Sequence, residues 1–268
     1  PAIRWLLTVV RQSSDTNLIK AVMTAVITAG LSFFPFLSLA KDETVTVPGP
    51  LGPLAGSYLA SPVSRQAQSV LILPGSGPTD RDGNNPLGIR AAPYKFLAKE
   101  LTKAGIASLR SDKRGLFGSH QAVTDPNQVV VDDYVADTRS WVTLLKEDKG
   151  HACVWLIGHS EGGLIALKSA AEIPGLSGII LIASPGYPID VILKKQLSDN
   201  PANQPLLDEA FRIIDLLKAG QKADISAAHP ALKQLFAPAV QGYLTDLMRH
   251  DPAALIAKNR WLAMRHGV

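Results

Sequence analysis

Between residues 43 and 183, short runs of uninterrupted apolar residues alternate with longer stretches in which apolar residues recur at helical spacing. Uninterrupted apolar runs are typical of strands that are buried on both faces of a sheet, and helical spacing is typical of the helices that cover it. We therefore predict a mostly parallel α/β sheet with helices on both faces. The predicted strands are Glu43–Val47, Leu54–Ala60, Ser69–Leu73, Ile106–Arg110, Cys153–Ile157 and Gly178–Ala183, and a Pro/Gly turn joins the first two into a hairpin.

The predicted helices carry start and stop signals of their own. Pro93–Ala104 is followed by Gly105, which suits the left-handed conformation at a helix end. Asp125 followed by Pro126 predicts the start of the next helix, because aspartate caps a helix N-terminus and proline fits the first helical position. A further helix is expected at Leu164–Ala171.

From Pro188 to about Lys258 the pattern is helical throughout. Apolar residues in 206–217 share one face of a helix that we expect to end at Gly220, and a second apolar stripe follows in 240–247. These helices could simply pack on the sheet, or they could form a cap over an active site. Sites in α/β sheets lie at the carboxyl ends of strands, and this segment follows a strand, so we favour the cap.

The N-terminal region has the pattern of a targeting segment. Residues 21–40 contain no charge, follow Lys20 and end in Ser38-Leu39-Ala40, which is typical of a secretory signal cleaved after Ala40. A membrane anchor is the alternative, since about 20 apolar residues can just span a bilayer, and a buried helix is the third interpretation. Pro35 and the small-residue ending favour cleavage. We expect 1–40 to be a signal peptide or N-terminal extension, and the mature protein to be secreted or periplasmic and free of the membrane.

Composition narrows the range of functions. The chain has 268 residues, of which 46% are hydrophobic and 19% charged, so it can form one large domain or two small ones and is not mainly disordered. The single cysteine, Cys153, excludes an internal disulfide framework and a cysteine-based zinc site. A net charge of +4 without a basic run gives no reason to expect nucleic acid. The usual metal and nucleotide motifs do not occur, so we expect no metal and no cofactor.

The strongest chemical signal follows the strand Cys153–Ile157. The next residues are Gly158-His159-Ser160-Glu161-Gly162, a G-x-S-x-G sequence between a strand and a helix. The glycines permit a tight, strained turn that presents the serine, so we predict Ser160 as a nucleophile.

A serine nucleophile needs donors for the oxyanion. We expect these to be the backbone N–H of Glu161, at the helix start, and the backbone N–H of Ser76, in the glycine-containing loop after Ser69–Leu73. A plain strand-end turn is the alternative interpretation of that loop.

Three blocks together resemble the α/β-hydrolase superfamily, and within it the secreted or periplasmic carboxylesterases near the serine aminopeptidase-like group. The blocks are Leu71–Asn85, Ser111–Ser119 and Leu156–Gly163. The resemblance implies an α/β-hydrolase core over 41–187 and a helical cap over 188–258.

Several details of these blocks bear on the site. Relatives usually carry His-Gly where this chain has Pro74-Gly75, a change that a backbone N–H donor tolerates. The resemblance implies structural roles for Asp112 and Arg114, and Asp80-Arg81-Asp82 is expected to shape the loop beside the pocket.

In this superfamily the nucleophile is followed along the chain by an acid and then by a histidine. The atypical tail 259–268 does not continue into the strands that carry these residues in relatives, so we expect a truncated C-terminal part. His266 is the one histidine after the cap, and Asp190 follows the strand Gly178–Ala183, so these are the candidate base and acid. The alternatives are a solvated tail histidine and a helix-start aspartate.

The implied activity is hydrolysis of small-molecule carboxylic esters, with short acyl chains, through a Ser160 acyl-enzyme. Thioesters or short peptides could be cut by the same site. The alternative is a catalytically impaired fragment, or a protein that binds a ligand in the cap pocket without turnover. Without later strands Gly178–Ala183 becomes an apolar edge, from which we predict homodimerisation or aggregation through that strand.

Overall fold

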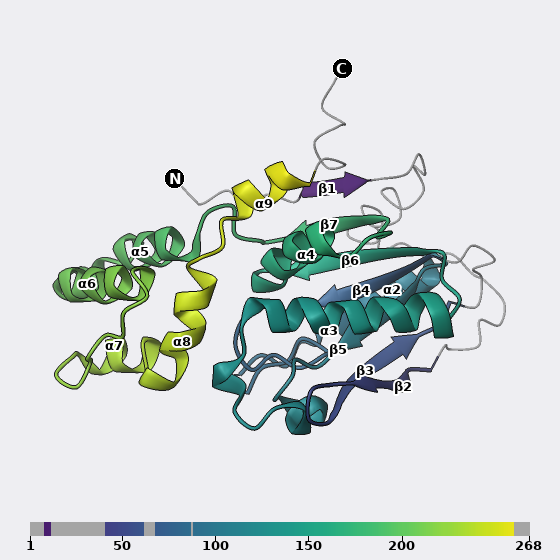
Figure 1. Ribbon diagram of the computed structural model, residues 1–268, viewed down its shortest axis with the longest axis horizontal. Helices are drawn as coiled ribbons and strands as arrows, with labels where there is room; N and C mark the ends of the chain where they lie inside the picture. Colours follow the sequence, from purple (N-terminus) through teal and green to yellow (C-terminus); the bar gives the residue numbers. More distant parts are fainter. Residues whose placement is uncertain (1–7, 12–40, 62–67, 87, 260–268) are drawn as a thin grey trace, which may run out of the picture.

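Seven strands form a single mixed sheet in the computed structural model, which describes residues 8–11, 41–61, 68–86 and 88–259 (Figure 1). The strand order is β1-β7-β6-β4-β5-β3-β2. The four central strands β5, β4, β6 and β7 are parallel, while the β2–β3 hairpin and β1 add antiparallel strands at the two edges. The bounds are β1 Thr8–Arg11, β2 Glu43–Pro48, β3 Pro53–Leu59, β4 Gln68–Leu73, β5 Ala107–Ser111, β6 Cys153–His159 and β7 Gly178–Ile182. The predicted sheet is thus confirmed.

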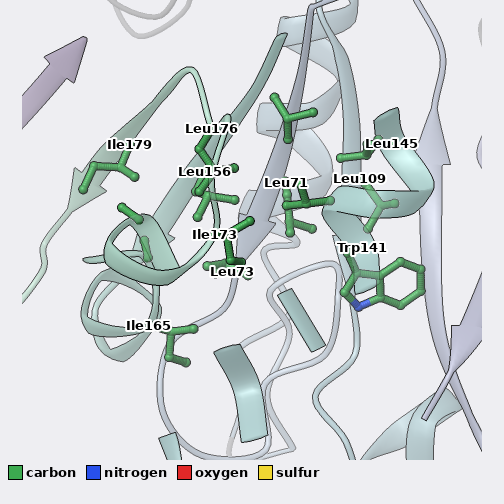
Figure 2. Close-up of a cluster of buried hydrophobic side chains, with 14 of the residues drawn as sticks. Leu71, Leu73, Leu109, Trp141, Leu145, Leu156, Ile165, Ile173, Leu176 and Ile179 are labelled. Atoms are coloured by element: carbon green, nitrogen blue, oxygen red, sulfur yellow. The ribbon is translucent and has the colours of Figure 1, made fainter. Parts of the chain in front are cut away.

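Helices cover both faces of this sheet because side chains alternate along each buried strand. Leu71 and Leu73 of β4 point to the face covered by α3 (Val131–Thr143) and α4 (Glu161–Glu172), and Val70 and Ile72 point to the face covered by α2 (Pro93–Lys103). Figure 2 shows the first of these layers, in which Trp141 and Ile165 meet the leucines of the strands. Burying each such side chain contributes about 1.5–3 kcal/mol.

The start of α3 differs from the sequence prediction. Asp125 does cap a helical turn, because its carboxylate accepts the N–H of Asn127 at 2.9 Å, but that turn is a short 3-10 helix, Pro126–Gln128. The chain then extends through Val130, whose N–H donates to the carboxylate of Asp133 at 2.9 Å, and α3 begins at Val131. Asp125 therefore caps the short 3-10 helix, and Asp133 stabilises the start of α3.

The block after β5 has the structural role that the resemblance implies. The Asp112 carboxylate accepts the backbone N–H groups of Arg81 at 2.8 Å and Gly118 at 3.0 Å, and it pairs with the Arg81 guanidinium. The buried Arg114 guanidinium makes two hydrogen bonds to the Asp137 carboxylate, at 2.8 and 2.6 Å. These charges fix the loops beside the carboxyl ends of the strands.

The helical segment after β7 forms a cap with a hydrophobic core of its own. Its helices are α5 (Ile189–Asp199), α6 (Leu207–Lys218), α7 (Pro230–Leu235) and α8 (Pro238–Leu247), which lie to one side of the sheet (Figure 1). Ile213, Ile214, Leu217 and Phe236 are fully buried in the cap core.

The last helix corrects the predicted boundary of the cap at 258. α9 (Pro252–Lys258) packs on α4 of the hydrolase core, and Asn259 donates to the carbonyl of Leu167 at 3.3 Å. The chain has therefore returned to the sheet layer before residue 258, and the cap core ends near Met248.

The expectation that Gly178–Ala183 forms a free edge is wrong for the described chain. β1 pairs antiparallel with β7, from Thr8 opposite Leu181 to Arg11 opposite Gly178, so the hydrogen-bonding edge of β7 is occupied. The sequence prediction missed β1 because it treated 1–40 as one N-terminal segment. The apolar stretch 21–40 and the tail with His266 lie outside the described residues. Within the described part of the chain, no helix is long and apolar enough to cross a membrane.

Pairing of β1 makes self-association depend on the N-terminal segment. We expect a variant that begins at Lys41 to associate through β7 as its concentration rises, because removing β1 exposes an edge that is apolar on both faces. Light scattering over a concentration series would compare it with the full chain, which should stay monomeric. If the variant also has the mass of a monomer at all concentrations, the prediction that it associates through β7 is wrong.

Candidate active site

Ser160 lies on a strained turn between β6 and α4. Its backbone angles are φ 53° and ψ −120°, a conformation that costs a residue other than glycine about 1–3 kcal/mol. The turn is held on both sides, because the Ser160 N–H donates to the carbonyl of Ile182 at 3.0 Å and the N–H of Gly163 donates to the carbonyl of Ser160 at 2.9 Å. This geometry agrees with the turn that the G-x-S-x-G sequence predicts.

Glycines allow the backbone segments around this turn to approach one another. A Cβ at Gly158 would collide with the carbonyl oxygen of Gly162, and a Cβ at Gly162 would collide with the carbonyl oxygen of Leu73. A Cβ at Gly163 would collide with the hydroxyl of Ser184. Backbone atoms cannot move aside as a flexible side chain can, so the turn requires glycine at 158 and 162.

The loop after β4 passes close to the nucleophile turn. A Cβ built on Gly75 would lie 3.3 Å from the Cβ of Ser160. The N–H of Gly75 donates to the hydroxyl of Tyr94 at 3.2 Å, so it is not free to bind a substrate oxygen. The N–H of Ser76 has no partner among the described residues. The N–H of Glu161 is in the first turn of α4, where helix geometry provides no acceptor.

A cavity of about 620 Å³ lies between the core and the cap, and Ser76, Ser160 and Glu161 all line it. The apolar stripe predicted in 240–247 faces this cavity, together with residues of α5. The apolar lining includes Leu164, Ile189, Ile192, Val240, Leu244 and Leu247. A cavity of this volume is within the range of small-molecule sites.

A buried ion pair lies beside the nucleophile. The Lys113 ammonium is 2.9 Å from the carboxylate of Glu161, and both side chains are only 6% exposed. Tyr134 and Tyr243 surround the pair, with their rings perpendicular and 6.2 Å apart. Burial raises the pKa of both tyrosines, and the nearby Glu161 carboxylate raises it further, so both hydroxyls are neutral. The two charges of the pair therefore compensate each other at the cavity wall.

The sequence analysis missed this pair. It used only the backbone N–H of Glu161, and it assigned no role to Lys113. A signal was available, because both residues follow the carboxyl ends of predicted parallel strands, and such ends meet at one edge of a sheet.

The chain is similar to known proteins in sequence and in fold. Residues 88–207, which include the nucleophile turn, match the family described as serine aminopeptidase, S33. Esterase EstD of Thermotoga maritima is 29% identical over 230 residues, which cover 84% of this chain and 50% of that protein. The chain thus spans half the length of this relative.

Solved structures share the fold. A carboxyl esterase from Bacillus coagulans superposes with a TM-score of 0.50 at 13% identity, covering 84% of this chain and 87% of that one. The hypothetical protein PA2218 from Pseudomonas aeruginosa gives 0.51 at 13% identity, covering 84% and 76%. These similarities show that the chain has the α/β-hydrolase fold.

The predicted acid is not brought to Ser160. Asp190 lies in the first turn of α5, where its carboxylate is 3.0 Å from the ammonium of Lys218, and it is absent from the cavity lining. The predicted base, His266, lies outside the described residues.

Another histidine does line the cavity. His250 follows α8, and its Nε2 is 3.7 Å from the carboxylate of Asp246. Asp246 is held in turn by the N–H of Val131 at 2.8 Å. No described side chain is hydrogen-bonded to the hydroxyl of Ser160. The described residues also contain no group of three His, Cys, Asp or Glu that could hold a metal ion.

We expect Gly162→Ala to unfold the protein or to lower its melting temperature strongly, because the new Cβ meets the carbonyl oxygen of Leu73. Overpacking against a side chain costs about 1–3 kcal/mol, and backbone gives way less readily. Gly242→Ala in α8 is the matched control, since nothing lies within 4 Å of a Cβ there. Circular dichroism during heating measures both variants. Equal melting temperatures would show that the close approach at Gly162 is not required.

Proposed function

We propose that this chain hydrolyses carboxylic esters through a covalent acyl-enzyme on Ser160. The observation that carries the proposal is the strained turn that presents Ser160 to a cavity shared with the N–H groups of Ser76 and Glu161. The similarity to a protein named as an esterase supports the same class of reaction.

The proposed reaction has two steps. In the first, the Ser160 hydroxyl loses its proton to a base and attacks the ester carbonyl, and the oxyanion accepts hydrogen bonds from the N–H groups of Ser76 and Glu161. The intermediate expels the alcohol, which takes the proton from the base. In the second step water attacks the acyl-enzyme in the same way and releases the acid. Loss of a single oxyanion donor typically costs a factor of about 10²–10³ in rate.

The proposed substrates are uncharged esters. The cavity lining is mostly apolar, and its one described carboxylate, Glu161, is already paired with Lys113. A free α-amino group would lack a partner there, which favours an ester over the substrate of an aminopeptidase. Short acyl chains fit with room to spare in about 620 Å³, so the proposal extends to chains of medium length.

Two histidines are candidates for the base. His266 is the residue proposed from the sequence, and His250 is the described histidine that lines the cavity. The second candidate function, ligand binding without turnover, is favoured by one observation, that no described side chain is hydrogen-bonded to Ser160.

Labelling with a fluorophosphonate tests both functions. We expect one adduct in the intact mass of the wild-type chain and none in Ser160→Ala, because only an activated serine reacts quickly. The variants His250→Ala and His266→Ala are labelled in parallel. The variant whose labelling slows by several orders of magnitude has lost the base. Hydrolysis of p-nitrophenyl esters of increasing chain length then measures acyl preference. A folded wild-type chain that takes no adduct would favour binding without turnover.

We also propose that the protein is secreted or periplasmic, on the pattern of residues 21–40. The intact mass of the protein that cells export should then be that of a chain beginning at Lys41. Full-length protein retained in the membrane fraction would favour the anchor instead.

A further inference from the structure

The hydroxyl of Tyr94 lies between the two loops that form the candidate site. Tyr94 is in the first turn of α2, and only 7% of the residue is exposed. Its hydroxyl oxygen accepts the N–H of Gly75 at 3.2 Å and is 2.8 Å from Nδ1 of His159. Gly75 immediately precedes the candidate oxyanion donor Ser76, and His159 immediately precedes Ser160. One hydroxyl therefore touches the neighbour of each functional residue.

One arrangement of the protons satisfies every group in this contact. Because the Tyr94 oxygen accepts from Gly75, its own proton is free to be donated to Nδ1 of His159. That bond requires a neutral imidazole that carries its proton on Nε2. Burial lowers the pKa of His159 and raises the pKa of Tyr94, so both groups are neutral near pH 7.

The two loops pass close to one another at this point. A Cβ on Gly75 would be 3.1 Å from Nδ1 of His159, so the backbone passes the imidazole without a side chain between them. We propose that Tyr94 is a positioning residue, whose hydroxyl fixes the N–H of Ser76 relative to the hydroxyl of Ser160. The inference rests on the proposed function.

The loop before α2 holds Tyr94 in place. The Tyr94 N–H donates to the carbonyl of Asp82 at 3.1 Å. Gly83, at φ +94°, leaves room where a Cβ would lie 2.7 Å from the ring of Pro93. The Asn84 side chain accepts the N–H of Ala92 at 3.0 Å, just before α2. The segment that was expected to shape the loop beside the pocket thus acts on the site through Tyr94.

Tyr94→Phe removes the hydroxyl and keeps the ring. We expect kcat for ester hydrolysis to fall about 10- to 100-fold with KM changed less than about twofold, because a displaced donor weakens binding of the transition state more than binding of the ground state. Labelling of Ser160 by the fluorophosphonate should slow to a similar extent.

Tyr58→Phe is the matched control. The Tyr58 hydroxyl is 2.8 Å from Nε2 of His151, Tyr58 is also 7% exposed, and His151 precedes β6, at the end opposite Ser160. This variant also loses one buried hydrogen bond, so its melting temperature should fall by a similar amount while its kcat stays unchanged. Equal activity losses in the two variants, or full kcat in Tyr94→Phe, would overturn the inference.

A measurement without substrate separates this inference from the proposed function. The ¹⁵N relaxation order parameter of the Ser76 amide should fall from about 0.85 toward 0.6 in Tyr94→Phe and stay unchanged in Tyr58→Phe. If the wild type hydrolyses no ester, the proposed function fails, and this order parameter still decides whether Tyr94 holds the loop. An unchanged Ser76 amide in Tyr94→Phe would overturn the positioning role.

Discussion

Close approach of backbone to backbone at the carboxyl ends of β4 and β6 is the constraint on which the rest of this site depends. The turn after β6 comes so near the end of β4 that a Cβ at Gly162 would collide with the carbonyl oxygen of Leu73, and within the turn a Cβ at Gly158 would collide with the carbonyl oxygen of Gly162. That approach brings the loop that contains Gly75 and Ser76 beside Ser160. The strain at Ser160 is sustained because the bonds to Ile182 and Gly163 hold the turn from both sides.

The core and the cap contribute different parts of the candidate site. The core provides Ser160 and the N–H groups of Ser76 and Glu161, while α5 and α8 of the cap provide much of the apolar lining. Lys113 and Glu161 bring opposite charges into this apolar region, at a desolvation cost that only their pairing offsets. Removing one partner would leave an unpaired buried charge beside Ser160, whereas the opposite charges of the intact pair cancel.

Features of the structure that depend on residues close together in the sequence were predicted well. The four central strands, α2, α4 and α6 lie within a few residues of their predicted bounds, because the period of apolar residues decides which face is buried. The strained turn at Ser160 was predicted because it is encoded locally, by glycines on both sides of the serine. The start of α3 was misplaced, since two aspartates offer caps within a few residues and only the path of the chain selects Asp133.

By itself, the sequence determined the α/β architecture, the helical cap and the position of the candidate nucleophile, because each of these follows from periodicity or from a contiguous motif. The tertiary structure alone decided the contacts between residues far apart in the chain. It paired β1 with β7, joined Lys113 to Glu161, set Tyr94 against His159 and placed Asp190 with Lys218 instead of near Ser160. Such contacts have no local signature, because folding brings together segments whose spacing in sequence says nothing about their distance in space.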